Sequence, residues 1–174
     1  MNVRHSQRLL QPALREQVIY ANDMQYGNST KLSRVGGLSP CWVMVPDSDV
    51  YVYADLKVPI DRVPGTPIVL KPVFVMSQGG GRVEAYVGVT VVGEGDDVSV
   101  VAPITGWLRT GMNAPPANVQ ATMPGVTVQA PWIDGRLPSC DLQLKIGRWG
   151  GFATDTADGT LYLIKVVAEY TAYV

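Results

Sequence analysis

The sequence is poor in the residues on which most catalytic and metal-binding sites depend. Its 174 residues include two cysteines and a single histidine, His5. Two cysteines are too few for a disulfide framework, and their spacing does not match that of a zinc ribbon. His5 lies near the N-terminus, in a segment without regular patterning, where a Ser/His/Asp or Cys/His catalytic arrangement is not expected. We therefore expect no enzymatic activity, no metal site and no cofactor.

Long apolar runs and targeting signals are also missing. No apolar run approaches the roughly 20 residues that a membrane-spanning helix needs. Residues 1–20 do not resemble a secretory signal. We therefore expect no membrane partner and folding in the cytoplasm, where Cys41 and Cys140 would remain as two buried thiols.

Charge is scarce as well. Charged residues make up 17% of the chain and hydrophobic residues 47%, so little charge is available to keep a monomer's surface solvated. This balance favours oligomerisation. The formal net charge of −1 argues against nucleic acid as a partner, since a general nucleic-acid binder usually carries a basic surface. Only residues 1–34 are locally basic, with five Lys and Arg residues against two Asp and Glu residues.

From residue 50 onward the chain reads as short strands separated by Gly, Pro and Asp. In residues 50–58 apolar residues alternate with Tyr, Asp and Lys, which is typical of a half-buried strand. Similar strands are expected at residues 68–76, 83–91, 98–104, 119–123, 126–130, 142–146 and 162–170. The strands at residues 68–76 and 83–91 are expected to form a hairpin, and residues 106–116 a long surface connection. Strands in this number, without a helix, predict two packed antiparallel sheets.

Residues 1–49 show no such alternation and are expected to form an N-terminal arm beside a β-domain of residues 50–174. Apolar residues spaced four apart predict a short helix that begins near Pro12. Residues 21–49 are rich in Asn, Ser, Gly and Pro, yet hold too many apolar side chains for a stretch that stays solvated. A disordered leader is the alternative, but we favour an arm that a partner orders. The residues expected to contact this partner are Arg4, Arg8, Leu9, Leu10, Arg15, Tyr20 and Trp42.

Two motifs invite a functional interpretation, and each has a simpler structural one. The glycines at 79–81, followed by Arg82, lack the spacing of a phosphate-binding loop and precede a strand, so a turn is expected. Asp96 with Asp97, and Asp155 with Asp158, do not reproduce a calcium-binding loop. We expect these carboxylates to be solvated turn residues.

The tryptophans offer a clearer signal. Trp107, Trp132 and Trp149 each stand beside Gly or Pro in presumed connections. This position favours a protein interface or a ligand-stacking surface over a place in the core.

Two parts of the β-domain resemble jelly-roll proteins from the virions of tailed phages. Residues 54–59 (ADLKVP), with the PGTP turn at 64–67 and the strand that follows, are similar to the opening hairpin of that group. The closing strands are similar as well, in residues 142–148 (LQLKIGR), 155–157 (DTA), 159–163 (GTLYL) and 169–170 (EY). The resemblance covers residues 50–174. It implies an all-β antiparallel sandwich of jelly-roll type with an extended N-terminal arm, in a trimeric, non-enzymatic part of a virion.

The same resemblance implies a bacteriophage capsid cement or decoration protein, or a head-fibre protein. As a cement protein the chain would fold in the host cytoplasm, form a homotrimer and bind the major capsid protein on the capsid surface. Its basic beginning would suit an acidic capsid surface, with apolar anchors at Leu9, Leu10, Tyr20 and Trp42. The alternative is a carbohydrate-binding module associated with a fibre or spike, in which Trp107 and Trp132 stack on sugars.

Overall fold

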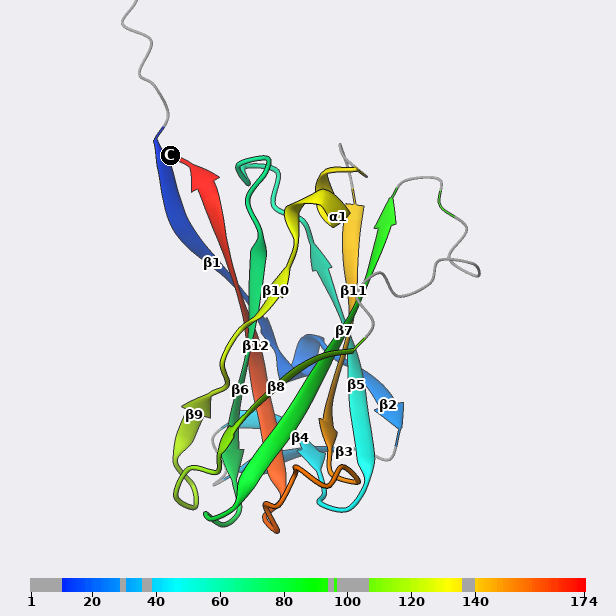
Figure 1. Ribbon diagram of the computed structural model, residues 1–174, viewed down its shortest axis with the longest axis vertical. Coiled ribbons are helices and arrows are strands. Elements are labelled where there is room, and N and C mark those ends of the chain that lie inside the picture. Colours follow the sequence, from blue (N-terminus) through cyan, green and yellow to red (C-terminus); the bar gives the residue numbers. More distant parts are fainter. Residues whose placement is uncertain (1–10, 29–30, 36–38, 94–95, 97–106, 136–139) are drawn as a thin grey trace, which may run out of the picture.

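The computed structural model describes residues 11–28, 31–35, 39–93, 96, 107–135 and 140–174, and these residues form two antiparallel β-sheets (Figure 1). The seven-stranded sheet contains β1 (Pro12–Tyr20), β3 (Lys31–Val35), β4 (Ser39–Met44), β6 (Ile68–Met76), β9 (Gln120–Thr122), β10 (Val126–Val128) and β12 (Leu161–Tyr173). The five-stranded sheet contains β2 (Gln25–Asn28), β5 (Asp49–Lys57), β7 (Arg82–Gly93), β8 (Trp107–Asn113) and β11 (Cys140–Trp149). Two short helical segments complete the described elements, η1 (Ala21–Asp23) and α1 (Ala130–Asp134).

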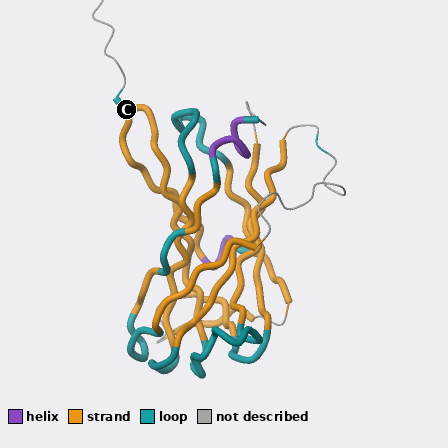
Figure 2. The backbone as a smooth tube through the Cα atoms, viewed as in Figure 1, coloured by secondary structure: helices purple, strands orange, loops and turns teal. Residues whose placement is uncertain are grey.

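The strand order identifies the architecture as the expected β-sandwich of jelly-roll type. The seven-stranded sheet has the order β10-β6-β12-β4-β3, with β1 also paired to β12 and β9 to β6, and the five-stranded sheet has the order β2-β5-β11-β7-β8. Most strands run along the long axis of the molecule, so most turns gather at its two ends (Figure 2). In the part of the chain that the structure describes, no helix is long and apolar enough to cross a membrane.

The core fills the space between the two sheets, and alternation along the strands creates it. In β5, buried residues alternate with half-buried or exposed ones, as residues 50–58 predict. In β7 and β11 every second residue likewise packs in the core against the facing sheet, although some residues on their outer faces are also buried. Because only one face of each strand turns inward, the outer face of each sheet remains available for other contacts.

The residues expected to form a separate arm contribute strands to both sheets. β1 pairs with β12 along its whole length, β4 continues along the same edge of β12, and β2 pairs with β5. Ile19, Met24 and Trp42 are buried in the common core. This corrects the expected boundary at residue 49, because the strands before it complete the sandwich. Residues 1–10 lie outside the described residues.

The short helix expected near Pro12 is strand β1 instead. Leu14 and Val18 stand four residues apart, a spacing that fits one face of a helix and one face of a strand equally well. β12 offers an edge along which all nine residues of β1 form a ladder. This long-range pairing decides the local structure, as tertiary contacts commonly do for strands.

The expected hairpin between residues 68–76 and 83–91 is wrong, although both strands exist. β6 pairs with β12, β9 and β10, whereas β7 pairs with β11 and β8 in the other sheet. The connection between them contains Gly80 and Gly81, whose φ angles of 100° and 72° suit glycine, and it crosses from one sheet to the other. Alternation within a strand shows which of its faces is buried. It does not show in which sheet the strand lies, because strands of both sheets bury one face in the common core.

The long surface connection expected at residues 106–116 is also corrected. Residues 107–113 form strand β8, which pairs with β7 from Gly88 opposite Trp107 to Arg82 opposite Asn113. Gly and Asn are uncommon in strands, so the composition of this stretch did not predict β8 or its pairing with β7. The strand expected at residues 98–104 lies outside the described residues.

Candidate functional site

One row of residues crosses the whole outer face of the five-stranded sheet. Cross-strand pairing places Gln25 opposite Tyr53, Tyr53 opposite Lys145, Lys145 opposite Gly88, and Gly88 opposite Trp107. Directly opposite residues on antiparallel strands point to the same face. The row therefore brings together side chains from five strands that are distant in the sequence.

Two glycines in neighbouring strands make room for aromatic rings on this face. A Cβ atom built on Gly88 would lie 2.8 Å from Cζ3 of Trp107, and one on Gly147 would lie 2.5 Å from Cζ of Tyr86. Both rings therefore cover glycine backbone, which places them close to the sheet. The two rings touch edge to face, with centroids 4.9 Å apart. The result is a low aromatic surface over the centre of the sheet.

A groove of about 310 Å³ lies between Trp107 and Tyr53, above Gly88. Both aromatic side chains remain partly exposed, Trp107 at 48% and Tyr53 at 43%. The other lining residues are Thr90, Gln143, Leu144 and Lys145. The groove combines aromatic walls with an amide and a hydroxyl, the composition typical of small-molecule sites that fix a ligand by a few polar contacts. Its volume lies at the lower end of the range for such sites.

Lys145 extends over the middle of the aromatic surface. Its Nζ lies 3.7 Å from the ring centroid of Tyr51 and 4.6 Å from that of Trp107. Both distances are within the range of cation–π attraction. Burial, followed by the neighbouring Tyr51, raises the pKa of Tyr53, and burial also raises the pKa of Tyr86. Both phenols are therefore neutral at physiological pH, and their protonated hydroxyls can donate hydrogen bonds.

The aromatic surface continues from Tyr86 to Trp149 and Phe152. The ring centroids of Tyr86 and Trp149 are 5.6 Å apart, and those of Trp149 and Phe152 are 4.3 Å apart. Arg109 covers this end, with its Cζ atom 5.0 Å from the Phe152 ring centroid. We name the rings of Tyr51, Tyr53, Tyr86, Trp107, Trp149 and Phe152 the aromatic face.

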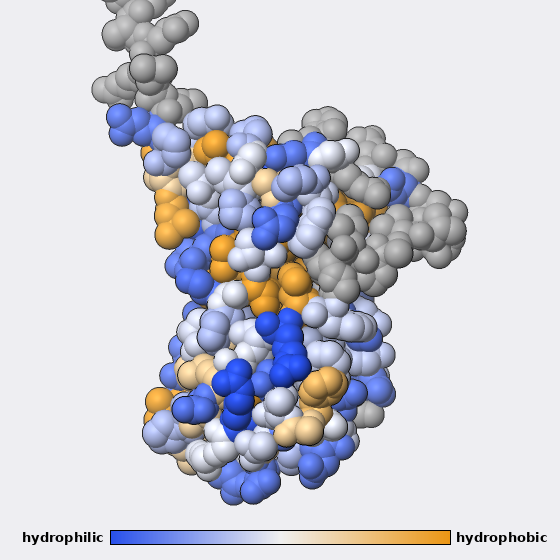
Figure 3. Space-filling view, in the orientation of Figure 1, coloured by the Kyte–Doolittle hydropathy of each residue, from blue (hydrophilic) through white to orange (hydrophobic). Residues whose placement is uncertain are grey.

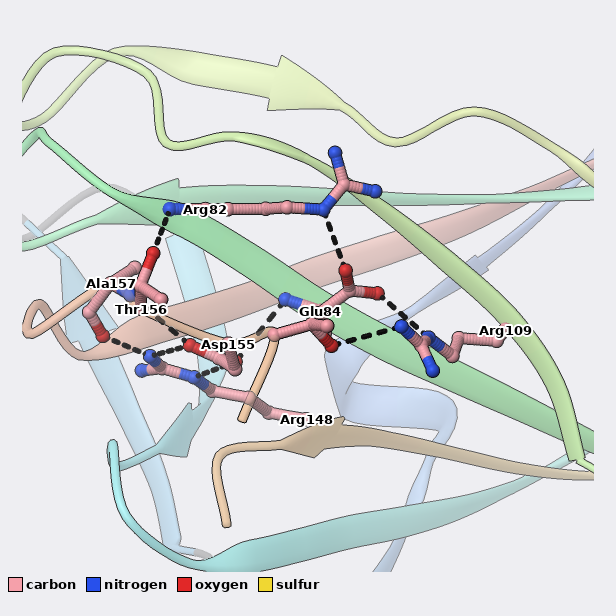
Figure 4. A network of polar contacts seen from close by, with 8 residues as sticks. Arg82, Glu84, Arg109, Arg148, Asp155, Thr156 and Ala157 are labelled. Atoms are coloured by element: carbon pink, nitrogen blue, oxygen red, sulfur yellow. Dashed lines mark hydrogen bonds and ion pairs between the residues drawn. The ribbon is translucent and has the colours of Figure 1, made fainter. Parts of the chain in front are cut away.

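Two linked ion-pair groups hold the loop that carries Phe152 (Figure 4). Arg148 Nε and Nη2 donate to the two carboxylate oxygens of Asp155 over 2.9 and 2.8 Å, and both side chains are buried. Arg148 also donates to the carbonyl oxygens of Ala157 and Gly159. The backbone N–H of Glu84 donates to Asp155 over 3.2 Å, and this contact ties the loop to β7.

Glu84 is the centre of the second group. Its buried carboxylate accepts hydrogen bonds from Arg82 Nε over 2.6 Å and from Arg109 Nε over 3.2 Å. Arg109 also donates to the hydroxyl of Thr154 over 2.9 Å. Strands β7 and β8 are thereby linked to the same loop. This support keeps the Trp149 end of the aromatic face in a fixed position relative to the sheet.

The structure brings together only some of the residues singled out in the sequence. Trp107 and Trp149 lie on the aromatic face, whereas Trp132, on α1, packs against the core. Trp42 is buried, and its indole N–H donates to the carbonyl oxygen of Ala21 over 2.8 Å. The structure therefore places Trp42 inside the chain, which corrects its assignment as a surface anchor.

The remaining residues expected to bind a partner fall into two groups. Arg15 and Tyr20 are exposed, and Arg15 donates to Asp61 over 2.8 Å. Arg4, Arg8, Leu9 and Leu10 lie outside the described residues, as does His5.

The described residues include both cysteines, and the same residues bear on whether a metal site is present. Cys41 in the seven-stranded sheet and Cys140 in the five-stranded sheet are both buried, which confirms the expectation of buried thiols. Among the described residues no group of three or more His, Cys, Asp or Glu side chains is arranged to hold a metal ion.

Of the seven residues that line the groove, only Trp107 was singled out from the sequence, and the missed residues include Tyr53, Gly88 and Lys145. The alternation of β5 and β11 places Tyr53 and Lys145 on the outer faces of their strands, which is a usable signal. A glycine inside an otherwise apolar strand is a second signal, because such a glycine often marks the close approach of another group. Their assembly into one row depends on the strand order.

Comparison with known proteins shows a similarity of fold only. No family model and no curated protein matches the sequence. A structure of infectious bursal disease virus, Gx strain, matches 94% of this chain and 32% of its own at 11% identity, with a TM-score of 0.42. The CBM22-1–GH10 modules of Clostridium thermocellum xylanase 10B match 86% of this chain and 26% of their own at 13% identity, with a TM-score of 0.48. The chain thus spans a third or less of these two proteins.

A cellulose-specific carbohydrate-binding module, CBM28, matches over most of both chains. The match covers 87% of this chain and 88% of the module at 6% identity, with a TM-score of 0.44. Identities this low describe a common architecture, and folds of this kind host many functions.

Proposed function

We propose that this protein is a non-enzymatic virion protein that binds carbohydrate through the groove on its five-stranded sheet. The observation that carries the proposal is the pair of partly exposed rings, Trp107 and Tyr53, that line one groove together with Gly88. A pyranose ring offers apolar C–H groups on its faces and hydroxyl groups around its edge. The faces suit aromatic walls, and the edge suits the polar side chains of Thr90 and Gln143.

The groove suits recognition without chemistry. Among the described residues, its polar lining consists of a hydroxyl, an amide, a phenol and an ammonium group, with no carboxylate. A glycosidase requires two carboxyl groups on opposite sides of the scissile bond. The side chains that line the groove therefore support binding in preference to hydrolysis.

We expect Trp107→Ala to weaken carbohydrate binding at least about tenfold, equivalent to about 1.4 kcal/mol. The substitution removes one wall of the groove, while Trp107 is exposed enough that folding should persist. The measurement is a glycan array with the full chain, followed by titration calorimetry on the saccharides that bind. Tyr20→Ala is the matched control, because Tyr20 is an exposed aromatic residue on the seven-stranded sheet. Equal binding by the wild type and Trp107→Ala would contradict the proposal.

The assignment to a virion rests on the resemblance of the closing strands to tailed-phage jelly-roll proteins. The resembling residues 142–148 and 155–163 correspond to β11, the loop after it and the start of β12. This segment contains both partners of the buried Arg148–Asp155 ion pair. The resembling residues therefore belong to one connected structural unit. We propose a bacteriophage fibre- or spike-associated role on this basis.

A capsid cement or decoration protein is the second candidate, and one surface favours it. Exposed apolar side chains gather where β1 begins and β12 ends, with Leu14 at 70% and Ile60 at 97% exposure. The backbone of Gln11 pairs with that of Val174 at this end, beside the chain's C-terminus (Figure 1). Four of the residues expected to bind a partner, Arg4, Arg8, Leu9 and Leu10, precede Gln11 in the sequence and lie outside the described residues. We propose that a homotrimer presents this end to the major capsid protein.

Two measurements separate the candidates. Light scattering after size-exclusion chromatography is expected to give the mass of three chains. On purified capsids that lack the protein, a cement role predicts that Leu14→Asp reduces co-sedimentation at least about tenfold, because a charge enters an apolar contact. Trp107→Ala should then bind capsids as the wild type does. Undiminished binding of Leu14→Asp would exclude this end as the capsid-binding surface.

A further inference from the structure

Lys145 differs from the two arginines that border the aromatic face, Arg82 and Arg109. Arg82 and Arg109 each form an ion pair with Glu84. Lys145 has only aromatic rings as partners among the described residues, where no carboxylate oxygen lies within 4.0 Å of its Nζ. Its positive charge therefore stands over the aromatic face without a carboxylate partner in the described part of the chain.

The position of this charge matches the position of the groove. β11 is the central strand of the five-stranded sheet, and Lys145 lies in the same cross-strand row as Tyr53, Gly88 and Trp107. The side chain is half-buried and lines the groove. A ligand that stacks on Trp107 would therefore contact the ammonium group, which lies 4.6 Å from the centroid of that ring.

We infer that the groove selects an acidic saccharide, whose sugar ring stacks on Trp107 and whose carboxylate or sulfate group pairs with Lys145. The inference rests on the proposed carbohydrate-binding function and adds the class of sugar. A hydrogen bond in which both partners are charged is roughly twice as strong as a neutral one. The surrounding rings limit the access of water to the ammonium group, which strengthens its attraction to an anion.

A purely structural role for Lys145 makes a different prediction. If the ammonium only fixed the rings of Tyr51 and Trp107 by cation–π attraction, its removal would weaken the binding of neutral and acidic saccharides equally. If the ammonium pairs with an anionic group of the ligand, its removal weakens the binding of acidic saccharides only. The two roles are therefore separable by comparing matched ligands on the same variant.

Titration calorimetry on the full chain provides this comparison. The ligands are trigalacturonate and its uncharged methyl ester, which share the same sugar backbone, and a sulfated galactan oligosaccharide with its desulfated form. We expect the acidic member of at least one pair to bind the wild type at least tenfold more tightly at low salt. Lys145→Gln should remove this difference and leave the neutral member within twofold. The pair that shows the difference identifies the acidic group as carboxylate or sulfate.

The matched control is Lys165→Gln. Lys165 also lies near an aromatic ring, with its Nζ 6.0 Å from the Tyr20 centroid, but on the seven-stranded sheet. Its loss should leave the preference for acidic saccharides unchanged. Equal affinity for acidic and neutral members, or equal losses for both in Lys145→Gln, would overturn the inference while the proposed function stands. If none of the four saccharides binds, the inference and the carbohydrate-binding function both fail for these sugar classes.

Discussion

Replacing Asp155 by alanine is expected to lower the free energy of unfolding by about 3–5 kcal/mol, the usual cost of removing one partner of a buried ion pair. The guanidinium of Arg148 would remain buried without its carboxylate, held only by the carbonyl oxygens of Ala157 and Gly159. The backbone N–H of Glu84 would lose its acceptor as well. Urea denaturation followed by tryptophan fluorescence measures the change, provided that the slope of the transition is constant.

An exposed ion pair provides the control for this experiment. Arg15→Ala removes the contact with Asp61, in which the arginine side chain is about half exposed. Exposed pairs contribute about 0–1 kcal/mol, so this variant should unfold close to the wild type. A loss of less than about 1 kcal/mol in Asp155→Ala would contradict the role that we assign to the buried pair.

The two glycines under the aromatic face are expected to respond differently to alanine. A Cβ on Gly147 would lie 2.5 Å from the backbone oxygen of Val50, which cannot move without disturbing β5. We expect Gly147→Ala to destabilise the fold by about 1–3 kcal/mol, the range for overpacked cores. At Gly88 the atoms nearest to such a Cβ belong to the Trp107 ring, and the next lie 3.7 Å away in Lys145. Trp107 can turn away, so Gly88→Ala should change stability by less than about 1 kcal/mol.

For saccharide binding we expect the larger loss in Gly88→Ala and the smaller loss in Gly147→Ala, the reverse of their order in stability. Gly88→Ala displaces Trp107 from its position against the Gly88 backbone and should weaken saccharide binding at least about tenfold, or about 1.4 kcal/mol, although no binding side chain is removed. Gly147→Ala lies under Tyr86, outside the groove lining, and should retain binding at temperatures where it is folded. Thermal unfolding and calorimetry on both variants test this. Full binding by Gly88→Ala would show that the position of Trp107 does not matter.

The burial of individual strands could be predicted from the sequence, because alternation is a local property. Val50, Val52 and Leu56 are buried as the pattern of β5 indicates. Strand partners could not be predicted in the same way. β6 and β7 follow each other closely in the sequence but lie in different sheets, and β1 finds its partner at the C-terminal end of the chain.

A proline and a bulge show why local patterns fail within β6 and β12. Pro72 cannot donate a ladder hydrogen bond, which is typical of an edge or bulged strand, yet β6 is internal, and Pro72 lies between the segments paired with β9 and β10. Its carbonyl accepts from Met123 on that side, so the missing N–H faces the gap between two short strands. In β12 the register shifts between Leu163 and Lys165, and this bulge reverses the alternation of inward and outward residues.

The groove was only partly predictable for the same reason. Trp107 was singled out by its glycine neighbour, and the outward phase of Tyr53 and Lys145 can be read from their strands. Their meeting depends on β11 lying between β5 and β7, with β8 at the edge. Figure 3 shows apolar and strongly hydrophilic surface side by side in the middle of one face, a mixture that composition alone does not reveal.

The central claim is that saccharides bind in the groove between Trp107 and Tyr53. The most direct measurement is a two-dimensional ¹H–¹⁵N NMR titration of the full chain with neutral and acidic oligosaccharides. We expect the largest shift changes at the indole N–H of Trp107 and at the backbone amides of Gly88, Gln143 and Lys145, with the seven-stranded sheet unaffected. Shift changes confined to the seven-stranded sheet, or none with any saccharide, would contradict the account.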